Sequence, residues 1–399
     1  STPLYSSAAS DVYKRQVLIY TTKASIYNKK VFSKFEKYIN MCPEINDKSA
    51  KKYIKQIKKY IGANDSMGKE RYSQMLDLMK HGIVIHHGSL PLQARLLLEQ
   101  FTNKGYCRIC FATSTLEQGI NMPFDVVYLN TFEASKPLSL KNLIGRAGRS
   151  TTEKKFDFGS IVVKVNNMSQ LREIINSSDV LEDVSMLESE VDDDLKEFKE
   201  SIINGTISDE YNITEKQLIK LKDESSENII NNILNTMFET NELVSLTTIN
   251  EDQECKLVLY DYFKQLYEYY LGRSLCDGEK QVFNTAIKIL LWQIHCKSFK
   301  DICFYRYSYA SKKKEREQLQ KEIEEGNEFE RHIASFKLQH LYASFISGYA
   351  EIPNKNLQVF SMFGNNEIKA IDVDYDRIVF DTYDYLDKII GFKLSDIFY

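Results

Sequence analysis

Three segments carry side chains suited to binding phosphate and sugar groups. Thr113–Pro123 reads TSTLEQGINMP, Leu143–Ser150 reads LIGRAGRS and His86–Pro91 reads HHGSLP. Hydroxyl groups and main-chain amides at a helix N-terminus bind phosphate oxygens. Guanidinium groups bind the same oxygens in a forked geometry. These residue types therefore predict recognition of a phosphorylated ligand.

The first segment follows a short apolar run directly, and we expect it to lie beyond the end of a strand. Thr113 and the two hydroxyl residues after it offer donors at a predicted helix N-terminus. Gly119 permits close approach of the backbone to a ligand. Asn121 offers an amide that can bond a sugar hydroxyl. In open α/β sheets, ligands gather beyond the carboxyl ends of the strands.

The second segment holds two arginines, Arg146 and Arg149, three residues apart. On a helix this spacing places both on one face. Their neighbours Gly145, Ala147 and Gly148 are small, so we expect both guanidinium groups to be unobstructed. Two arginines on a helix are more commonly a solvated surface pair, and both interpretations stay open on this pattern alone.

The front of the chain predicts a doubly wound parallel α/β sheet, because short β-branched or aromatic runs alternate with helical segments. The expected strands are Val17–Tyr20, Gly82–His86, Arg108–Ala112, Val126–Asn130 and Ser160–Val165, and the expected helices are Lys48–Ile61, Lys69–Lys80, Pro91–Asn103 and Ser139–Ala147.

From residue 169 to residue 399 the pattern is mainly helical, with charged faces. The charge run at Lys312–Glu330 predicts a solvated helix face, since opposite charges lie three and four residues apart. Aromatic residues between Tyr260 and Tyr270 could stack bases, but helix-core packing is favoured. Short strands are expected at Leu357–Phe363, Lys369–Val373 and Arg377–Phe380.

The two ends of the chain do not resemble the rest. Residues 1–16 (STPLYSSAASDVYKRQ) show no apolar periodicity and no signal-peptide pattern, and they look like a translated adaptor or vector sequence. We expect them to be disordered. We also expect the helical region to be truncated at Tyr399. The predicted domains are thus 17–168, an α/β domain, and 169–399, a helical region.

Charge divides the chain in the same place. Residues 1–168 hold 26 Lys and Arg against 13 Asp and Glu, whereas the remainder holds 26 against 43. The basic front suits a phosphate-bearing partner, and the acidic back suits a protein partner. The longest apolar run is too short to cross a membrane. Seven irregularly spaced cysteines indicate reduced thiols in a cytoplasmic protein. Cys107 and Cys110 are expected on opposite faces of a strand, with no metal site.

In this order and spacing the motifs resemble the C-terminal RecA-like half of superfamily 2 helicases, in the DExH superkiller-like branch. That family reads T-x-T-L-x-x-G-x-N-x-P and Q-x-x-G-R-A-G-R, and VLIYTTK at Val17–Lys23 resembles the motif that opens the half. The resemblance covers about residues 17–165. One departure is Asn142, which stands where the family has Gln.

The resemblance implies roles for particular residues. Arg146 and Arg149 would reach the γ-phosphate of ATP, with Arg149 as the arginine finger. Gly119 and Asn121 would lie near the nucleotide. The phosphodiester backbone of a single DNA or RNA strand would be contacted by Thr22, Thr113 and Gln118. His87 and Gly88 would form a turn in which packing is at least as probable as strand contact.

The nucleotide-cradling half of such an enzyme is missing from the sequence. No GxxxxGK[ST] motif and no DExH motif is present, so ATP and Mg²⁺ would be bound mainly by another domain. Gly62–Lys69 (GANDSMGK) is rejected as a phosphate loop, because Glu70 stands where Ser or Thr is needed. We therefore predict that the chain is the C-terminal part of an ATP-dependent helicase, and that this part alone does not hydrolyse ATP. The alternative is a non-catalytic module that binds nucleic acid or protein.

Overall fold

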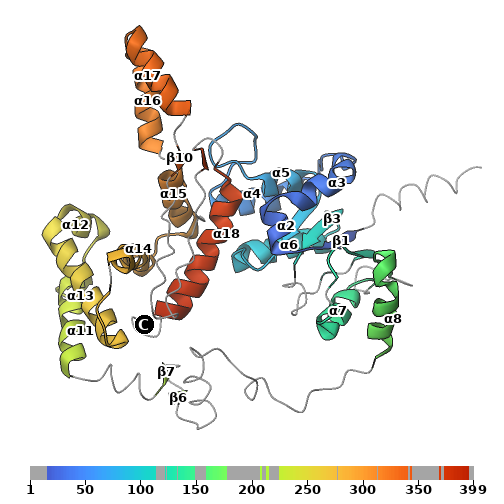
Figure 1. The fold of residues 1–399 in the computed structure, drawn as a ribbon, viewed down its shortest axis with the longest axis horizontal. Coiled ribbons are helices and arrows are strands. Elements are labelled where there is room, and N and C mark those ends of the chain that lie inside the picture. Colours follow the sequence, from blue (N-terminus) through green and yellow to red (C-terminus); the bar gives the residue numbers. More distant parts are fainter. Residues whose placement is uncertain are drawn as a thin grey trace, which may run out of the picture. The chain divides into compact units, whose positions relative to one another are not determined.

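A computed structural model describes the chain over residues 16–113, 122, 124–132, 134–148, 159–177, 207–208, 213–214, 224–275, 277–311, 313–339, 342–343, 368–369 and 373–394. The chain divides into two compact units (Figure 1). Unit 1 comprises residues 1–181 with 374–380, and unit 2 comprises residues 182–373 with 381–399.

Unit 1 is built on a five-stranded parallel sheet in the order β2-β3-β1-β4-β5. The strands are β1 Val17–Tyr20, β2 Ile83–His86, β3 Ile109–Ala112, β4 Val126–Leu129 and β5 Ser160–Val162. All residues of β2 and β3 are buried, as expected of parallel strands covered on both faces. The predicted RecA-like doubly wound sheet is confirmed.

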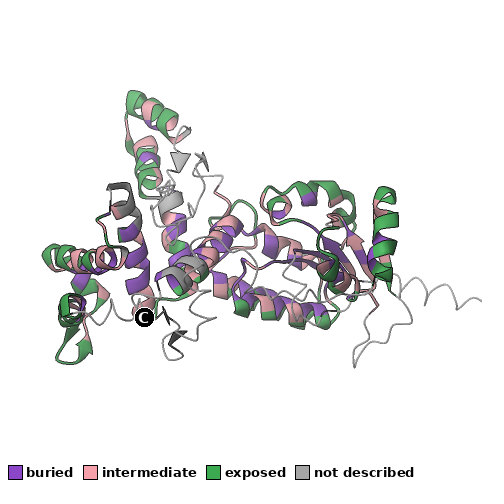
Figure 2. Cartoon of the chain, turned by 60° about the horizontal axis from the view of Figure 1, so that its bottom comes forward, coloured by how far each residue is buried: buried purple, intermediate pink, exposed green. Residues whose placement is uncertain are grey.

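Helices flank the sheet within unit 1. They are α2 Lys23–Tyr27, α3 Lys30–Asn40, α4 Lys48–Ile61, α5 Gln74–Lys80, α6 Leu92–Asn103, α7 Pro137–Ile144, the 3₁₀ turn Val165–Asn167 and α8 Met168–Asn176. On α3, Phe32 and Phe35 place their rings against Phe111 of the sheet, 5.3 and 5.9 Å between ring centroids. Figure 2 shows buried residues concentrated where these helices meet the strands.

Local caps explain several helix ends. The Asp47 carboxylate accepts the Ala50 amide at 2.9 Å and begins α4, and Gly62 ends that helix in the left-handed conformation at φ 70°. The prediction of α4 is confirmed. By contrast, α5 begins only at Gln74, because the Ser73 hydroxyl caps it by accepting the Leu76 amide at 3.2 Å.

Unit 2 is mainly helical, as predicted. Its helices are α11 Glu224–Met237, α12 Leu246–Glu251, α13 Gln253–Leu271, α14 Asp277–Ile294, α15 Phe299–Ala310, α16 Lys313–Glu325 and α17 Glu328–Gln339, and the π-helical turns Leu386–Leu394 follow later in the chain. Short strands pair as β6 Ile207–Ser208 with β7 Ile213–Thr214, β8 Phe238–Glu239 with β9 Glu242–Leu243, and β10 Tyr342–Ala343 with β11 Ile368–Lys369.

Aromatic residues of α13 pack in the core of unit 2. Phe263 and Tyr267 are buried, and the Tyr267 ring stacks on Phe283 at 5.0 Å. The core interpretation of this stripe is thus confirmed at these positions. Helix α18, Tyr375–Tyr385, begins in unit 1 and ends in unit 2. Among the described helices, none is long and apolar enough to cross a membrane.

Sequence-based expectations are wrong at three further places in the fold. Arg377–Phe380 is helical, because the Asp374 side chain accepts the amides of Asp376 and Arg377 and begins α18 there. Cys107 precedes β3, so strand parity does not separate it from Cys110. The Cys107 side chain hydrogen-bonds Cys110 and, with burial, raises the pKa of that thiol.

The third concerns Gln16, which the sequence assigned to the disordered segment. Gln16 is buried, and its Nε2 donates to the carbonyl oxygens of Thr102 and Cys107 at 2.8 and 3.1 Å. Its own carbonyl accepts the amides of Asp125 and Val126. Gln16 is therefore part of the folded domain. Residues 1–15 and the expected strand Leu357–Phe363 lie outside the described residues.

Candidate functional site

The carboxyl ends of four parallel strands are aligned at one edge of the sheet. Tyr20 of β1 is in register with Ala112 of β3 and Leu129 of β4, and Ala112 is in register with His86 of β2. The residues that follow these strands consequently lie side by side. Parallel α/β sheets place ligand sites at this edge.

Main-chain hydrogen bonds tie the post-strand residues to one another. The Thr21 amide donates to the Ala112 carbonyl at 2.9 Å, and the Thr113 amide donates to the His86 carbonyl at 3.3 Å. On the other side, the Asn130 Nδ2 donates to the Thr21 hydroxyl at 3.2 Å. Thr113 and the Thr21–Thr22 pair, which come from distant parts of the sequence, are thereby brought to adjacent positions.

Thr22 and Thr113 differ in accessibility. Thr22 is exposed, and its Oγ1 accepts the Ser25 amide at 3.2 Å as the N-cap of α2. Thr113 is only 7% exposed. Of the two hydroxyl residues, Thr22 is thus the more accessible to a ligand at this edge.

His87 follows β2 at the same edge but is fully buried. Its ring packs edge-on against Tyr27 of α2 at 5.8 Å and against Phe380 of α18 at 4.2 Å. The Nδ1 atom accepts the Ser89 amide at 3.1 Å, which shapes the HHGS turn. These contacts favour the packing interpretation of His87.

Sequence reasoning missed two residues at this edge. Asn130 follows β4 immediately, and Lys34 of α3 donates to its Oδ1 atom. The Lys34 ammonium also lies over the Tyr128 ring, 5.8 Å from its centroid. A polar residue directly after a buried parallel strand was the signal for Asn130. No local signal marked Lys34, because only the packing of α3 on the sheet brings it here.

The turn that carries Arg146 lies at the opposite, amino-terminal edge of the sheet. The Phe124 amide, just before β4, donates to the Arg146 carbonyl at 3.1 Å, and the Gly148 amide donates to the Phe124 carbonyl at 2.8 Å. Gly159, just before β5, lies so close to the same turn that an added Cβ would come within 2.3 Å of the Ala147 carbonyl carbon. This motif therefore does not lie with Thr113 at the carboxyl edge, where ligand sites are expected.

The conformation of this turn also differs from expectation. Helix α7 ends at Ile144, and Gly148 adopts a left-handed conformation at φ 68°, so residues 146–148 are not helical. Arg146 is 6% exposed rather than unobstructed. Arg149, Gln118, Gly119 and Asn121 lie outside the described residues.

The TSTLEQGINMP motif connects the two edges. It begins at Thr113 beyond β3, and by Phe124 the chain has reached the amino-terminal edge beside the Arg146 turn. Met122, near the end of the motif, is fully buried and anchors the connection. A ligand at either edge would thus contact a different end of one motif.

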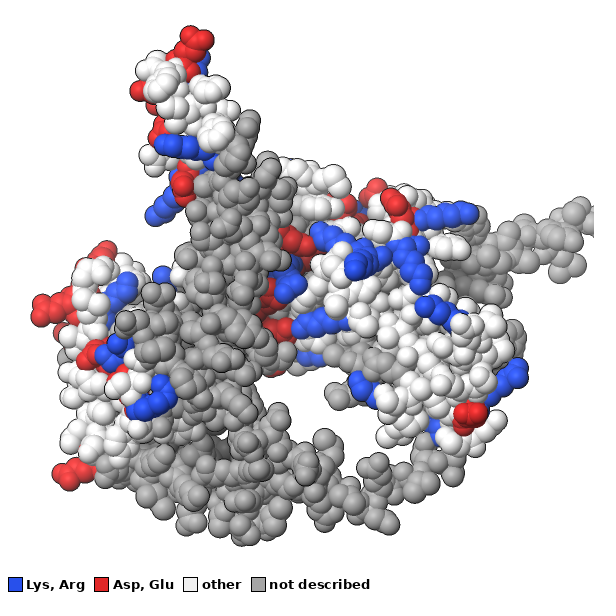
Figure 3. All heavy atoms as spheres, in the orientation of Figure 1, with Lys and Arg blue, Asp and Glu red and all other residues white. Residues whose placement is uncertain are grey.

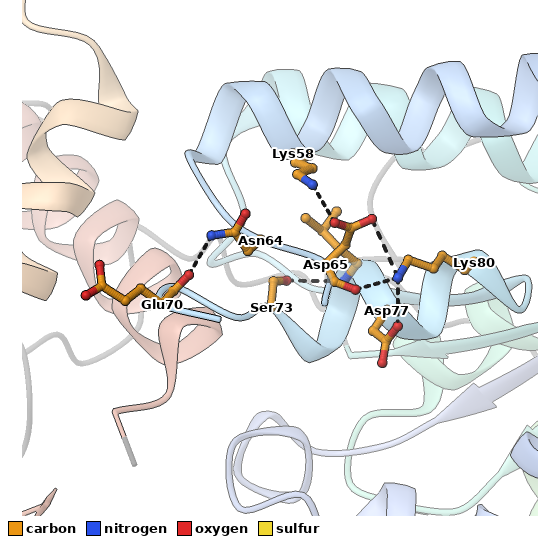
Figure 4. A network of polar contacts seen from close by, with 8 residues as sticks. Lys58, Asn64, Asp65, Glu70, Ser73, Asp77 and Lys80 are labelled. Atoms are coloured by element: carbon orange, nitrogen blue, oxygen red, sulfur yellow. Dashed lines mark hydrogen bonds and ion pairs between the residues drawn. The ribbon is translucent and has the colours of Figure 1, made fainter. Parts of the chain in front are cut away.

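The Gly62–Lys69 loop joins two helices. Lys58 and Lys80 both pair with Asp65, and Asp77 also pairs with Lys80 at 3.0 Å (Figure 4). The Asn64 side chain donates to the Glu70 carbonyl at 2.6 Å. Asp65 of the loop is therefore paired with lysines of the two helices that the loop joins. Over the described residues, no three His, Cys, Asp or Glu side chains cluster as a metal site.

Comparison with known proteins places these motifs in context. The family described as "Helicase conserved C-terminal domain" matches residues 59–151. The chain is 26% identical over 112 residues to the ATP-dependent DNA helicase Hel308 of Caldivirga maquilingensis, which covers 26% of this chain and 14% of that protein. It is 28% identical over 147 residues to the probable ATP-dependent DNA helicase HFM1 of Mus musculus, covering 35% of this chain and 10% of that protein.

A further relative is the Hachiman protein HamB of Bacillus cereus, 34% identical over 104 residues, or 25% of this chain and 9% of that protein. The matched segment thus spans about a seventh or less of each of these three relatives. The segment that resembles the helicase C-terminal domain includes Thr113 and the Arg146 turn, whereas Thr22 lies before it.

Proposed function

We propose that this chain is the C-terminal part of an ATP-dependent nucleic-acid helicase or translocase. The observation that carries the proposal is the match of residues 59–151 to the helicase C-terminal domain. It falls on a RecA-like sheet whose motif residues occupy two edges. The names of the relatives, which include ATP-dependent DNA helicases, support the same activity.

Strand contact is assigned to the carboxyl edge. Thr22 and Thr113, together with Gln118, would bind the phosphodiester backbone of a single DNA or RNA strand without reading bases. The basic balance of the front half supports a phosphate-bearing partner. On the face drawn in Figure 3, Lys and Arg gather over α2 and α3 of unit 1.

Nucleotide contact is assigned to the amino-terminal edge. A guanidinium group is a donor that fits phosphate oxygens, and Arg146 provides one in this turn. Arg149 would stabilise the charge on the transferred phosphoryl group, and Gly119 and Asn121 would face the nucleotide. No three His, Cys, Asp or Glu side chains cluster among the described residues, and we assign the Mg²⁺ ligands to another RecA-like half.

When ATP is bound between two such halves, its hydrolysis supplies the free energy for strand movement. The segment from Thr113 to Phe124 would then link the two activities, because it runs from one edge to the other. Displacement at the Arg146 turn would reach Thr113 through a single stretch of chain. This connection explains how a nucleotide-facing turn could alter the grip on a strand.

Substitutions at Thr22 test the strand site. Thr22→Asp preserves the N-cap of α2, since Asp caps as well as Thr, but it places a negative charge against the proposed phosphate contact. We expect single-strand affinity to fall at least tenfold at about 0.1 M salt, measured by fluorescence anisotropy on the purified chain. Thr22→Asn, the uncharged capping control, should stay within threefold of wild type. Equal affinity for wild type and Thr22→Asp would contradict the assignment.

A further inference from the structure

Helix α4 carries a row of exposed lysines on the side opposite its buried face. Of its 14 residues, six are lysine and none is acidic. Ala50, Ile54, Ile57 and Ile61 form the buried face, and the exposed lysines occupy the opposite side. Lys48, Lys52, Lys55 and Lys59 follow the helical repeat and define what we call the α4 lysine row.

The α4 lysine row is unpaired within the part of the chain that the structure describes. Its four ammonium groups have no ion pair or hydrogen bond to any described residue there, whereas Lys58, at the edge of the helix face, pairs with Asp65 (Figure 4). On α16, by contrast, Lys and Arg alternate with Glu along the helix. Helix α4 thus carries six lysines and no acidic residue of its own to pair with them.

Such a row is locally unfavourable. Like charges three or four residues apart destabilise a helix, and cations in its first turns oppose the helix dipole. Lys48 lies at the first helical position, and Lys52 follows one turn later. Local departures of this kind commonly mark functional surfaces rather than folding requirements.

The row begins at the other edge of the sheet from the proposed strand site. The segment that leads into α4 lies at the amino-terminal edge, where Arg108 donates to the Pro43 carbonyl and the Ile45 amide donates to the Lys80 carbonyl. The helix then packs beside α5 and α6. Thr22 and Thr113 follow β1 and β3 at the carboxyl edge. The row thus starts at the amino-terminal edge and runs along the outer side of α4 toward Ile61, whose carbonyl accepts the Tyr375 hydroxyl, so it is a helix surface distinct from the post-strand residues.

We propose that the α4 lysine row binds the sugar-phosphate backbone of duplex nucleic acid. At about 1.5 Å per residue the row extends roughly 16 Å along a rigid axis, and a duplex presents one negative charge per about 1.7 Å. Surfaces for single strands add aromatic stacking platforms, whereas the row contains lysines alone and Tyr53 packs against Phe101 instead. The partner is therefore the duplex next to the translocated strand, and the inference rests on the proposed function.

The test replaces the row without changing helix propensity. A Lys48→Gln, Lys52→Gln, Lys55→Gln, Lys59→Gln variant of the full chain is compared with a matched control, Lys297→Gln, Lys300→Gln, Lys314→Gln, Lys321→Gln, which alters the net charge equally in unit 2. Circular dichroism verifies folding. Fluorescence anisotropy measures binding of a 20-base-pair duplex and of a 20-nucleotide single strand from about 50 to 300 mM salt.

We expect the row variant to bind the duplex at least tenfold more weakly than the control does. The slope of log K against log salt should fall by about 0.9 for each phosphate that the variant no longer neutralises. Single-strand affinity should change less than threefold, whereas Thr22→Asp should reduce it and spare the duplex. The inference is overturned if duplex affinity falls no more than in the control, if single-strand affinity falls equally, or if the wild-type chain binds no duplex. The first two outcomes leave the Thr22 test of the proposed function standing.

Discussion

Thr22 performs a structural task with the same hydroxyl that the proposed function assigns to strand contact. Its Oγ1 accepts the Ser25 amide and begins α2, while the side chain stays exposed. A hydroxyl can serve both purposes, since it accepts one bond and donates another. In the proposed function, the Thr22 hydroxyl would therefore both begin α2 and contact a nucleic-acid strand.

The two arginines of the GRAGR motif differ in what the structure describes. Arg146 is buried in a turn held by main-chain bonds to Phe124. Burial of this kind suits a residue that orders the turn as well as one that contacts a phosphate. Arg149, which lies outside the described residues, keeps its proposed role as the arginine finger.

Substitution of Arg149 tests that role in a protein containing both RecA-like halves. Loss of an arginine finger reduces kcat by roughly 10³–10⁵, so Arg149→Ala should abolish most strand-stimulated turnover. Arg149→Lys keeps the charge but not the planar fork and should not restore the rate. Steady-state ATPase assays beside a nucleotide-binding titration would measure both effects. Turnover of Arg149→Ala within about threefold of wild type, under 1 kcal/mol, would contradict the proposal.

The first turns of α18 belong to unit 1 and pack against its helices. The Tyr375 hydroxyl donates to the Ile61 carbonyl at 2.7 Å, and the Phe380 ring stacks on Tyr27 at 5.5 Å. The Asp376 carboxylate accepts the Ser73 hydroxyl at 2.5 Å and the Met75 amide at 2.8 Å, so it caps α5 from almost the other end of the chain. The α/β domain is thus not a continuous stretch of sequence.

Asp376 makes the stability of unit 1 depend on pH. Burial, reinforced by the neighbouring Asp374, raises the pKa of Asp376 to about 7, against the bonds from Ser73 and Met75 and the charge of Lys29. The folded state then holds more protons than the unfolded state between about pH 4 and 7. Stability must therefore decrease as pH rises through this window, by at most about 1.4 kcal/mol per pH unit.

We expect Asp376→Asn to remove this slope, because an amide has the same shape and does not titrate. Chemical denaturation of the chain at intervals from pH 4 to pH 8 measures the effect. Asp252→Asn is the control, since Asp252 caps α13 and Asn also caps. An unchanged slope in Asp376→Asn, or a slope equally flattened in the control, would show that other groups set the pH dependence.

For the whole molecule, charge and motif content separate the two parts of the chain. The front is basic and carries the helicase motifs, whereas the acidic helical region carries no helicase motif. A protein partner for the acidic helices remains our proposal for that region. The motifs present resemble those of one RecA-like half.

This content predicts the behaviour of the chain alone. Without a phosphate loop or acidic Mg²⁺ ligands from a second RecA-like half, the purified chain should release no phosphate from ATP above background. Salt-sensitive binding to nucleic acid should persist through the basic half. Strand-stimulated ATP hydrolysis by the purified chain in a phosphate-release assay would contradict this interpretation of its motifs.

The sequence by itself determined the class of the sheet and the positions of its strands. Short β-branched runs between amphipathic segments have few alternatives, and β1, β2 and β3 lie where the pattern places them. It also determined α4, because Asp47 and Gly62 act on their own helix ends. The spacing of the motifs also indicated the resemblance to the helicase C-terminal domain, since the residues within each motif are contiguous in the sequence.

Only the tertiary structure decided which residues share a surface. Gln16 looked like part of an unrelated segment, yet its amide satisfies carbonyl groups of Thr102 and Cys107, which are distant in sequence. The Arg146 turn lies at the edge opposite Thr113 because α7 runs back along the sheet before β5 begins. Asp376 caps α5 across about 300 residues. Sequence patterns report only on residues within a few helical turns of one another. Whether a side chain is buried, and which groups it hydrogen-bonds, depends on residues that the fold brings next to it.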